Sequence, residues 1–173
     1  GIAWLHTENQ HYGAVDNFKW YDSSKVNPPD ATGQDLAYVP DDNFEQGLID
    51  LGYDDVLDDY VATANISGIT ELTLNDKSIS DLTGIEYFVS LSYLSLGENR
   101  LQTLDVSHNT ALTNLFVHGN NFQTLDVSHN TALTNLSVHG NNLEDLDLGA
   151  NSVLETLNCN GNQLESLDLS MYP

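Results

Sequence analysis

A 21-residue internal repeat constrains this chain more than any other feature. Residues 101–121 and 122–142 are identical except at Leu101/Phe122 and Phe116/Ser137. The same frame continues in both directions as columns spaced by 21 residues: Leu91, Leu112, Leu133 and Leu154; Leu94, Leu115, Leu136 and Leu157; and Asn99, Asn120, Asn141 and Asn162. A unit this short cannot bury its own apolar face, so the chain must fold by stacking similar units.

Each unit predicts one short strand followed by an extended return segment. Leu115 and Val117 alternate with the period of a strand, and the strands of successive units would lie about 4.8 Å apart in a parallel sheet. The asparagine column falls where the chain turns away, so its side-chain amides are expected to satisfy open backbone groups. Leu104 and Val106 would point inward from the return segment. No return segment has helical periodicity, which predicts an extended or turn-like convex side.

The frame L-x-x-L-x-L-x-x-N-x-L resembles the leucine-rich repeat. Five copies are in register, at residues 69–90, 91–111, 112–132, 133–153 and 154–173. The run L-D-V-S-x-N-T-A-L-T-x-L, at 104–115 and 125–136, is similar to leucine-rich repeats of secreted and surface proteins of Bacteroidetes. This resemblance implies a leucine-rich-repeat solenoid that is secreted or displayed at the cell surface. The family often has cysteine at the position of Cys159, which is therefore expected to be a core residue.

The segment before the repeats predicts an N-terminal helical cap over residues 39–68. Asp42 followed by Glu45 has capping-box spacing, and Gly52 would end a helix over about 42–51. Phe44, Leu48, Ile49 and Leu51 are expected to form its apolar face. Residues 1–38 do not fit the repeat and are interpreted as the remnant strand of a preceding β domain plus a linker. Within them, residues 1–21 resemble the closing strand of a jelly-roll carbohydrate-binding domain.

Charge and missing motifs exclude several function classes. Four basic residues stand against 26 acidic ones, a net charge of −22. Such a chain is a poor ligand for nucleic acid or an anionic membrane surface. No apolar run is long enough to insert into a membrane. The sequence also lacks G-x-S-x-G, H-E-x-x-H and phosphate-binding glycine motifs, so we expect no catalytic residues in this chain.

The outward positions of the predicted strands form the candidate ligand-binding surface. They are polar, almost uncharged, and carry aromatic and imidazole groups that suit a protein loop or a sugar. The predicted site residues are Tyr93, Asn114, Phe116, His118, Asn135, Ser137, His139 and Asn158. The alternative is that these are ordinary solvated strand positions.

Metal binding is an open alternative rather than the expectation, and no cofactor is predicted. His118 and His139 would lie one strand spacing apart, but no third ligand stands beside them. His108 and His129 form a second copied pair. Asp105, Asp126, Asp147 and Asp168 form a carboxylate ladder on the return path, with Ser107, Ser128 and backbone amides as expected partners. Calcium binding stays an alternative for this ladder and for the Asp54–Asp59 cluster, although the D-x-D-x-D-G loop of the EF-hand is absent from the sequence.

These patterns predict a non-catalytic extracellular binding or adhesion module that recognises a protein or glycan on its concave β-face. Two alternatives stay open: the C-terminal accessory region of a secreted polysaccharide-degrading enzyme whose catalytic domain lies upstream, and a passive spacer. Because no capping segment follows the last repeat, oligomerisation through that repeat is also considered.

Overall fold

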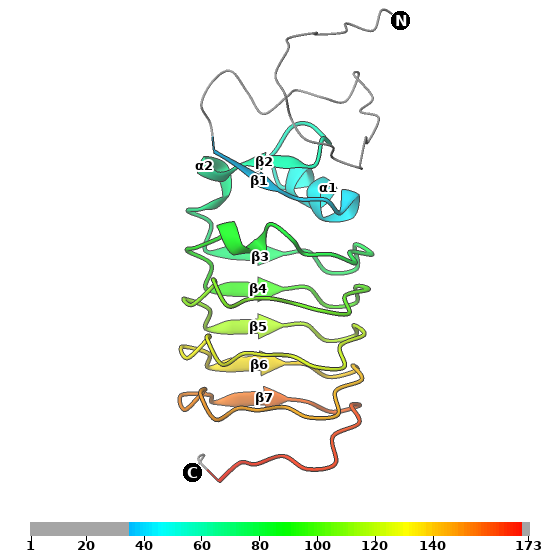
Figure 1. The fold of residues 1–173 in the computed structure, drawn as a ribbon, viewed down its shortest axis with the longest axis vertical. Coiled ribbons are helices and arrows are strands. Elements are labelled where there is room, and N and C mark those ends of the chain that lie inside the picture. The colour runs from blue at the N-terminus through cyan, green and yellow to red at the C-terminus, as the bar shows by residue number, and fades with distance from the viewer. Residues whose placement is uncertain (1–34, 171–173) are drawn as a thin grey trace, which may run out of the picture.

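The computed structural model describes residues 35–170. Figure 1 shows a stack of parallel strands in sequence order, with the helices and a two-stranded sheet at its N-terminal end. The elements are β1 (Leu36–Tyr38), α1 (Asp42–Asp50), β2 (Tyr60–Ala62), α2 (Thr63–Ile66), β3 (Glu71–Thr73), the 3₁₀ turn η1 (Ile85–Tyr87), β4 (Tyr93–Ser95), β5 (Asn114–Phe116), β6 (Asn135–Ser137) and β7 (Thr156–Asn158).

The five-stranded parallel sheet confirms the predicted leucine-rich-repeat solenoid. Its order is β3-β4-β5-β6-β7, and Leu94, Leu115, Leu136 and Leu157 are register partners along the stack. Between residues 69 and 170 the only helical return is the three-residue η1, so the other return segments are extended or turn-like as expected.

The core lies between the sheet and the return segments. Leu94 and Leu115 are fully buried from the sheet side, and Val106 and Val127 close the other wall at no more than 1% exposure. In the last described repeat, Leu157, Cys159 and Leu164 are only partly buried, because β7 has a paired neighbour on one side alone among the described strands. Cys159 thus packs against the core, as predicted.

Side-chain hydrogen bonds from the predicted asparagine column link each repeat to the one before it. The Asn120 side-chain amide donates to the carbonyl oxygens of Leu96 at 2.9 Å and Val117 at 3.1 Å, and its Oδ1 accepts from the Leu101 amide at 3.0 Å. Equivalent bonds are made by Asn99, Asn141 and Asn162. These buried amides satisfy turn carbonyls that the sheet leaves open.

A second asparagine column lies on the return path, outside the strand-and-turn frame of the leucine-rich repeat. Asn109 and Asn130 are fully buried. The Asn109 amide donates to the carbonyl oxygens of Ile85 at 2.9 Å and Phe88 at 3.0 Å, and Asn130 repeats the arrangement one turn later. Successive repeats are therefore hydrogen-bonded to each other at two places: at the turn after each strand and on the return path.

The expected cap helix is α1, with two corrections. Its N-cap is Asp41 rather than Asp42: the Asp41 Oδ1 accepts from the amides of Asn43 and Phe44, both at 3.0 Å. Leu51 is 45% exposed and does not belong to the apolar face, because it follows the last helical turn. Gly52 ends the helix as predicted, with a φ of 79° in the left-handed region.

Tertiary hydrogen bonds explain why the cap begins one residue earlier than its sequence suggests. The Asp41 Oδ2 accepts from the Ser80 amide and hydroxyl, both at 2.8 Å, and from the Asp81 amide at 3.0 Å. Burial alone would raise the pKa of Asp41, but these bonds and the one from Phe44 outweigh it and lower the pKa. The same carboxylate thus caps α1 and anchors the first repeat.

The cap also contains a two-stranded antiparallel sheet, with α1 between its strands in the sequence, that the repeat frame does not indicate. β1 pairs antiparallel with β2, so Leu36–Tyr38 lies beside the strand that follows α1. The jelly-roll resemblance within residues 1–21 lies outside the described residues. The proposed domain boundaries stay predictions. Among residues 35–170, none of the helices could cross a membrane.

Candidate binding surface on the sheet

The strand register gathers the predicted site residues on one surface. Tyr93, Asn114 and Asn135 are successive register partners, as are Ser95, Phe116, Ser137 and Asn158. They alternate with the core leucines Leu94, Leu115, Leu136 and Leu157, so their side chains point away from the core. We call this surface, together with Gly97, His118 and His139 at the strand ends, the sheet face.

An aromatic pair occupies the N-terminal part of the sheet face. The rings of Tyr93 and Phe116 lie 5.4 Å apart between centroids, at an interplanar angle of 48°. This is a favourable tilted arrangement for two aromatic rings. Both side chains are half-buried, so each keeps part of its ring available to a partner. The residue that matches Phe116 in the next repeat is Ser137, which shows that the fold does not require an aromatic ring here.

Beside this pair, two histidines form a stack. The rings of His118 and His139 are nearly parallel, at 4°, with centroids 4.6 Å apart. Gly97 makes room for the stack, because a Cβ at this position would overlap the His118 ring. The nitrogen lone pairs lie in the ring planes, so parallel rings do not aim them at a shared ion. This geometry argues against a metal held between the two histidines.

Polar neighbours hold only one of the two imidazoles. The Nδ1 of His139 lies 2.9 Å from the Ser137 hydroxyl and 3.1 Å from the Asn158 amide nitrogen. An amide nitrogen can only donate, so His139 Nδ1 accepts and the neutral ring carries its proton on Nε2. The Nδ1 of His118 is buried and has no hydrogen-bond partner among the described residues.

The sheet face is neutral in a strongly acidic chain. No Asp, Glu, Lys or Arg occupies the outward positions of β4 to β7, although the whole chain carries a net charge of −22. A neutral polar surface with aromatic groups loses less hydration energy on contact than a charged one. Among the surfaces of residues 35–170, the sheet face is therefore the one best suited to burial in an interface with a ligand.

The carboxylate ladder is held by its own turns, as expected. The Oδ1 atoms of Asp105, Asp126, Asp147 and Asp168 each accept from the backbone amide two residues later, at 2.8–2.9 Å. Hydrogen bonds from the Ser107 hydroxyl and amide lower the pKa of Asp105, and those from Ser128 lower that of Asp126. These bonds give the ladder a structural role.

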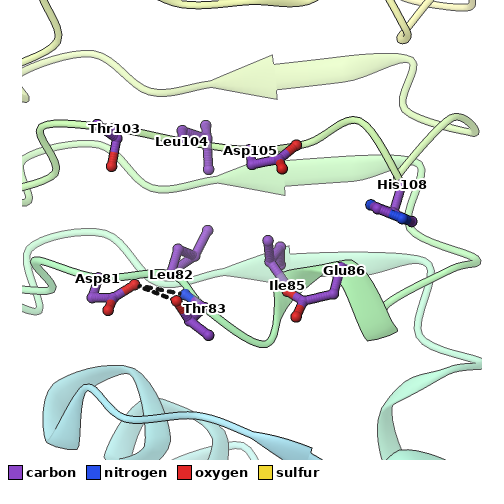
Figure 2. A pocket seen from close by; sticks show the side chains of 9 residues that line it. All are labelled: Asp81, Leu82, Thr83, Ile85, Glu86, Thr103, Leu104, Asp105 and His108. Carbon is purple, nitrogen blue, oxygen red and sulfur yellow. Dashed lines mark hydrogen bonds between the residues drawn. The ribbon is translucent and has the colours of Figure 1, made fainter.

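A hollow of about 310 Å³ lies between the first two return segments (Figure 2). Its carboxylates already have local partners. Asp81 accepts from the Thr83 amide at 2.9 Å and hydroxyl at 2.8 Å, and Glu86 accepts from the Gly84 amide at 2.8 Å. His108 sits at one end of the hollow. Since local turns occupy these acids, the hollow offers little unsatisfied polar chemistry to a ligand.

Comparison with known proteins places the solenoid beside bacterial internalins. The chain is 35% identical over 73 residues to internalin J of Listeria monocytogenes, a match covering 42% of this chain and 8% of that protein. The solved functional domain of internalin J superposes with a TM-score of 0.73 at 34% identity, covering 80% of this chain and 31% of the domain structure. A leucine-rich-repeat protein of Leptospira interrogans gives a TM-score of 0.58 at 28% identity, over 60% of this chain and 28% of that structure.

The chain is thus a leucine-rich-repeat protein similar to Listeria internalins, and it spans less than a third of the solved internalin J domain. No family model matches it. One difference is plain. The functional domain of internalin J includes a cysteine ladder, whereas this chain has a single cysteine, Cys159. The position one repeat earlier than Cys159 is Val138, which is fully buried. Cysteine is therefore not repeated at this strand position, where the two preceding repeats have Val117 and Val138.

Proposed function

We propose that this leucine-rich-repeat solenoid, similar to Listeria internalins, is a non-catalytic protein-binding module of a secreted or cell-surface protein. The observation that carries the proposal is the neutral sheet face, where the Tyr93–Phe116 pair adjoins the His118–His139 stack. Aromatic side chains supply much of the binding energy at protein interfaces, and charged residues are depleted from interface cores. The sheet face has both properties.

Each group on the sheet face has a distinct role in the proposed interface. Phe116 and Tyr93 provide the apolar anchor, which a partner side chain would cover. The stacked rings of His118 and His139 extend this surface beside the aromatic pair. Asn114, Asn135, Ser137 and Asn158 surround the aromatic groups with neutral donors and acceptors, as the polar rim of an interface does.

A glycan is the competing ligand for the same surface, because sugars also stack on aromatic rings. We favour a protein because the sheet face is an extended surface. The hollow described above lies on the return side, as does a second one lined by residues 145–149, Ser166 and Asp168. The accessory role in a polysaccharide-degrading enzyme is the remaining predicted alternative.

The passive spacer has one observation in its favour, which is the near-identity of residues 101–121 and 122–142. Recently copied repeats need no tailored site. Association through the last repeat stays a further prediction, supported by the partial exposure of Leu157 and Leu164.

The test is a binding screen of the purified chain against host-surface proteins and glycans, with matched variants. The double variant Phe116→Ser/His118→Ala removes the anchor while placing at 116 the residue that position 137 already carries. The control, His108→Ala/His129→Ala, alters a histidine pair on the return side. We expect binding of a protein that the first variant loses and the control retains.

Other outcomes point elsewhere. Binding of glycans alone would replace the proposed ligand class. Binding that survives Phe116→Ser/His118→Ala would remove the sheet face as the site. No binding by the parent chain would favour the spacer.

A further inference from the structure

We propose that Asp42, Glu45 and Asp59 form a calcium site in the N-terminal cap. One carboxylate oxygen from each residue lies within 4.8 Å of the others. Asp42 and Glu45 sit three residues apart on α1, so they project from one side of the helix. Asp59 comes from the loop that leads into β2, where its backbone is left-handed with a φ of 71°. The site thus joins the helix to the loop that packs beside it.

Glu45 supplies the observation that separates this group from an ordinary acidic cluster. Its side chain is fully buried. Its Oε1 accepts from the amides of Asp58 at 2.9 Å and Tyr60 at 3.2 Å, while its Oε2 is buried without any partner. An ionised carboxylate that is removed from water with one bare oxygen is costly. A cation at the three carboxylates would satisfy that oxygen.

The surrounding electrostatics point the same way. Burial raises the pKa of Glu45 to about 7, and the nearby charges of Asp54 and Asp58 raise it further. Burial also raises the pKa of Asp54, whose Oδ2 is likewise buried without a hydrogen bond. Among the described residues, the ion pair in this region joins Lys77 to Asp50 at the C-terminal end of α1, and it involves none of the three proposed ligands.

The ligand chemistry selects calcium among the common cations. All three donors are carboxylate oxygens, and no histidine or cysteine joins the group. Oxygen-only sites suit calcium and magnesium. Calcium tolerates irregular arrangements of six to eight oxygens at about 2.3–2.6 Å, whereas magnesium demands a near-ideal octahedron at about 2.0–2.1 Å. Two side chains on a helix and one on a loop match the more permissive ion, and the exposed side of Asp42 leaves room for water ligands.

The experiment titrates calcium into the metal-free chain at neutral pH by calorimetry, with thermal unfolding followed in parallel. We expect one calcium ion per chain with a Kd of about 10⁻⁴–10⁻³ M, as in extracellular modules, and a melting temperature that rises with calcium. Asp59→Asn and Asp42→Asn should each weaken binding by about tenfold or more, as losing a ligand charge does. Both residues lie outside the core, so their variants are expected to fold.

The matched control is Asp55→Asn, which removes the same charge from the same acidic loop without touching the three ligands. It should retain binding to within about threefold, since it alters only the surrounding field. Three results would overturn the proposal: no saturable calcium binding and no calcium-dependent melting shift, equal losses in Asp55→Asn and Asp59→Asn, or an equal response to magnesium at the same concentration. These outcomes are independent of whether the sheet face binds a protein.

Discussion

Removing one amide from the asparagine column should destabilise the solenoid by an amount that can be worked out bond by bond. Asn120→Ala deletes the two N–H donors that Leu96 and Val117 accept, and the acceptor for the Leu101 amide. The same amide group also lies 3.2 Å from the His118 carbonyl oxygen, which keeps the Glu98 amide as a donor. The two carbonyls keep other partners, because Leu96 also accepts from Asn99, and Val117 from Asn141. The Leu101 amide keeps none among the described contacts, and Leu101 is fully buried.

The expected cost follows from this inventory. One orphaned buried amide costs about 1–3 kcal/mol, and each shared hydrogen bond that is lost contributes about 0.5–1.5 kcal/mol. We therefore expect Asn120→Ala, which loses two such bonds and orphans one amide, to lower the free energy of unfolding by about 2–6 kcal/mol.

Asn109→Ala is the matched comparison, because it truncates a buried asparagine of the second column. Its carbonyl partners also keep other donors: Ile85 accepts from the Phe88 amide, and Phe88 from the Leu91 amide. The substitution orphans no backbone amide that the Asn109 side chain was serving, and it removes a side-chain Oδ1 that is buried without a partner. Its cost should therefore be smaller than that of Asn120→Ala by at least about 1 kcal/mol.

Urea denaturation followed by circular dichroism measures both variants against the parent chain. The comparison uses the difference in midpoint at a common slope, since the two variants expose similar surface on unfolding. An equal or greater loss in Asn109→Ala would refute the reasoning, because it would mean that truncation of a buried side chain, rather than the orphaned amide, sets the cost.

Three further predictions concern the cap, its contact with the first repeat, and the last repeat. Because burial raises the pKa of Glu45 from 4.5 to about 7 in the metal-free chain, the folded state holds its proton more tightly; the stability this gives is complete below pH 4.5 and is lost as the pH rises through about 7. Glu45→Gln should flatten that loss in urea melts across this range. Gly84→Ala should cost about 2 kcal/mol or more, measured the same way, because the φ of Gly84 is 106° and a Cβ would lie 2.7 Å from Val39 Cγ2 and 2.9 Å from the Tyr38 oxygen. Cys159→Val should change the free energy of unfolding by less than about 1 kcal/mol, because valine fills the same position one repeat earlier, as Val138. A larger loss of stability would indicate a role for the thiol beyond packing.

The repeat frame predicts the solenoid because the same leucine and asparagine spacing recurs from repeat to repeat and can be recognised within about 21 residues. A period of 21 residues fixes which leucines align, and the register follows without any knowledge of distant contacts. The same frame places Tyr93, Phe116 and His118 on one surface. It does not indicate that two histidine rings stack, because that depends on the space left by Gly97 in the neighbouring repeat.

The cap shows what a local pattern leaves out. Asp41 and Asp42 are equally good N-cap residues by type, and the choice between them is made by Ser80 and Asp81, which lie 39 and 40 residues away. β1 and β2 are three residues each and carry no strong alternation, so their pairing depends on tertiary contacts. The second asparagine column was present in the sequence as Asn109 and Asn130, and its fixed spacing is the signal that would have revealed it.

The asparagine columns also bear on how such a chain can change over evolutionary time. Each 21-residue unit brings its own donors for the unit before it and its own open acceptors for the unit after it. A copied unit inserted in frame therefore meets compatible neighbours at both of its edges, with no compensating substitution. Residues 101–121 and 122–142 look like the product of such an event. Solenoid length can then vary by whole turns while the cap stays unchanged, and only the extent of the neutral surface grows or shrinks.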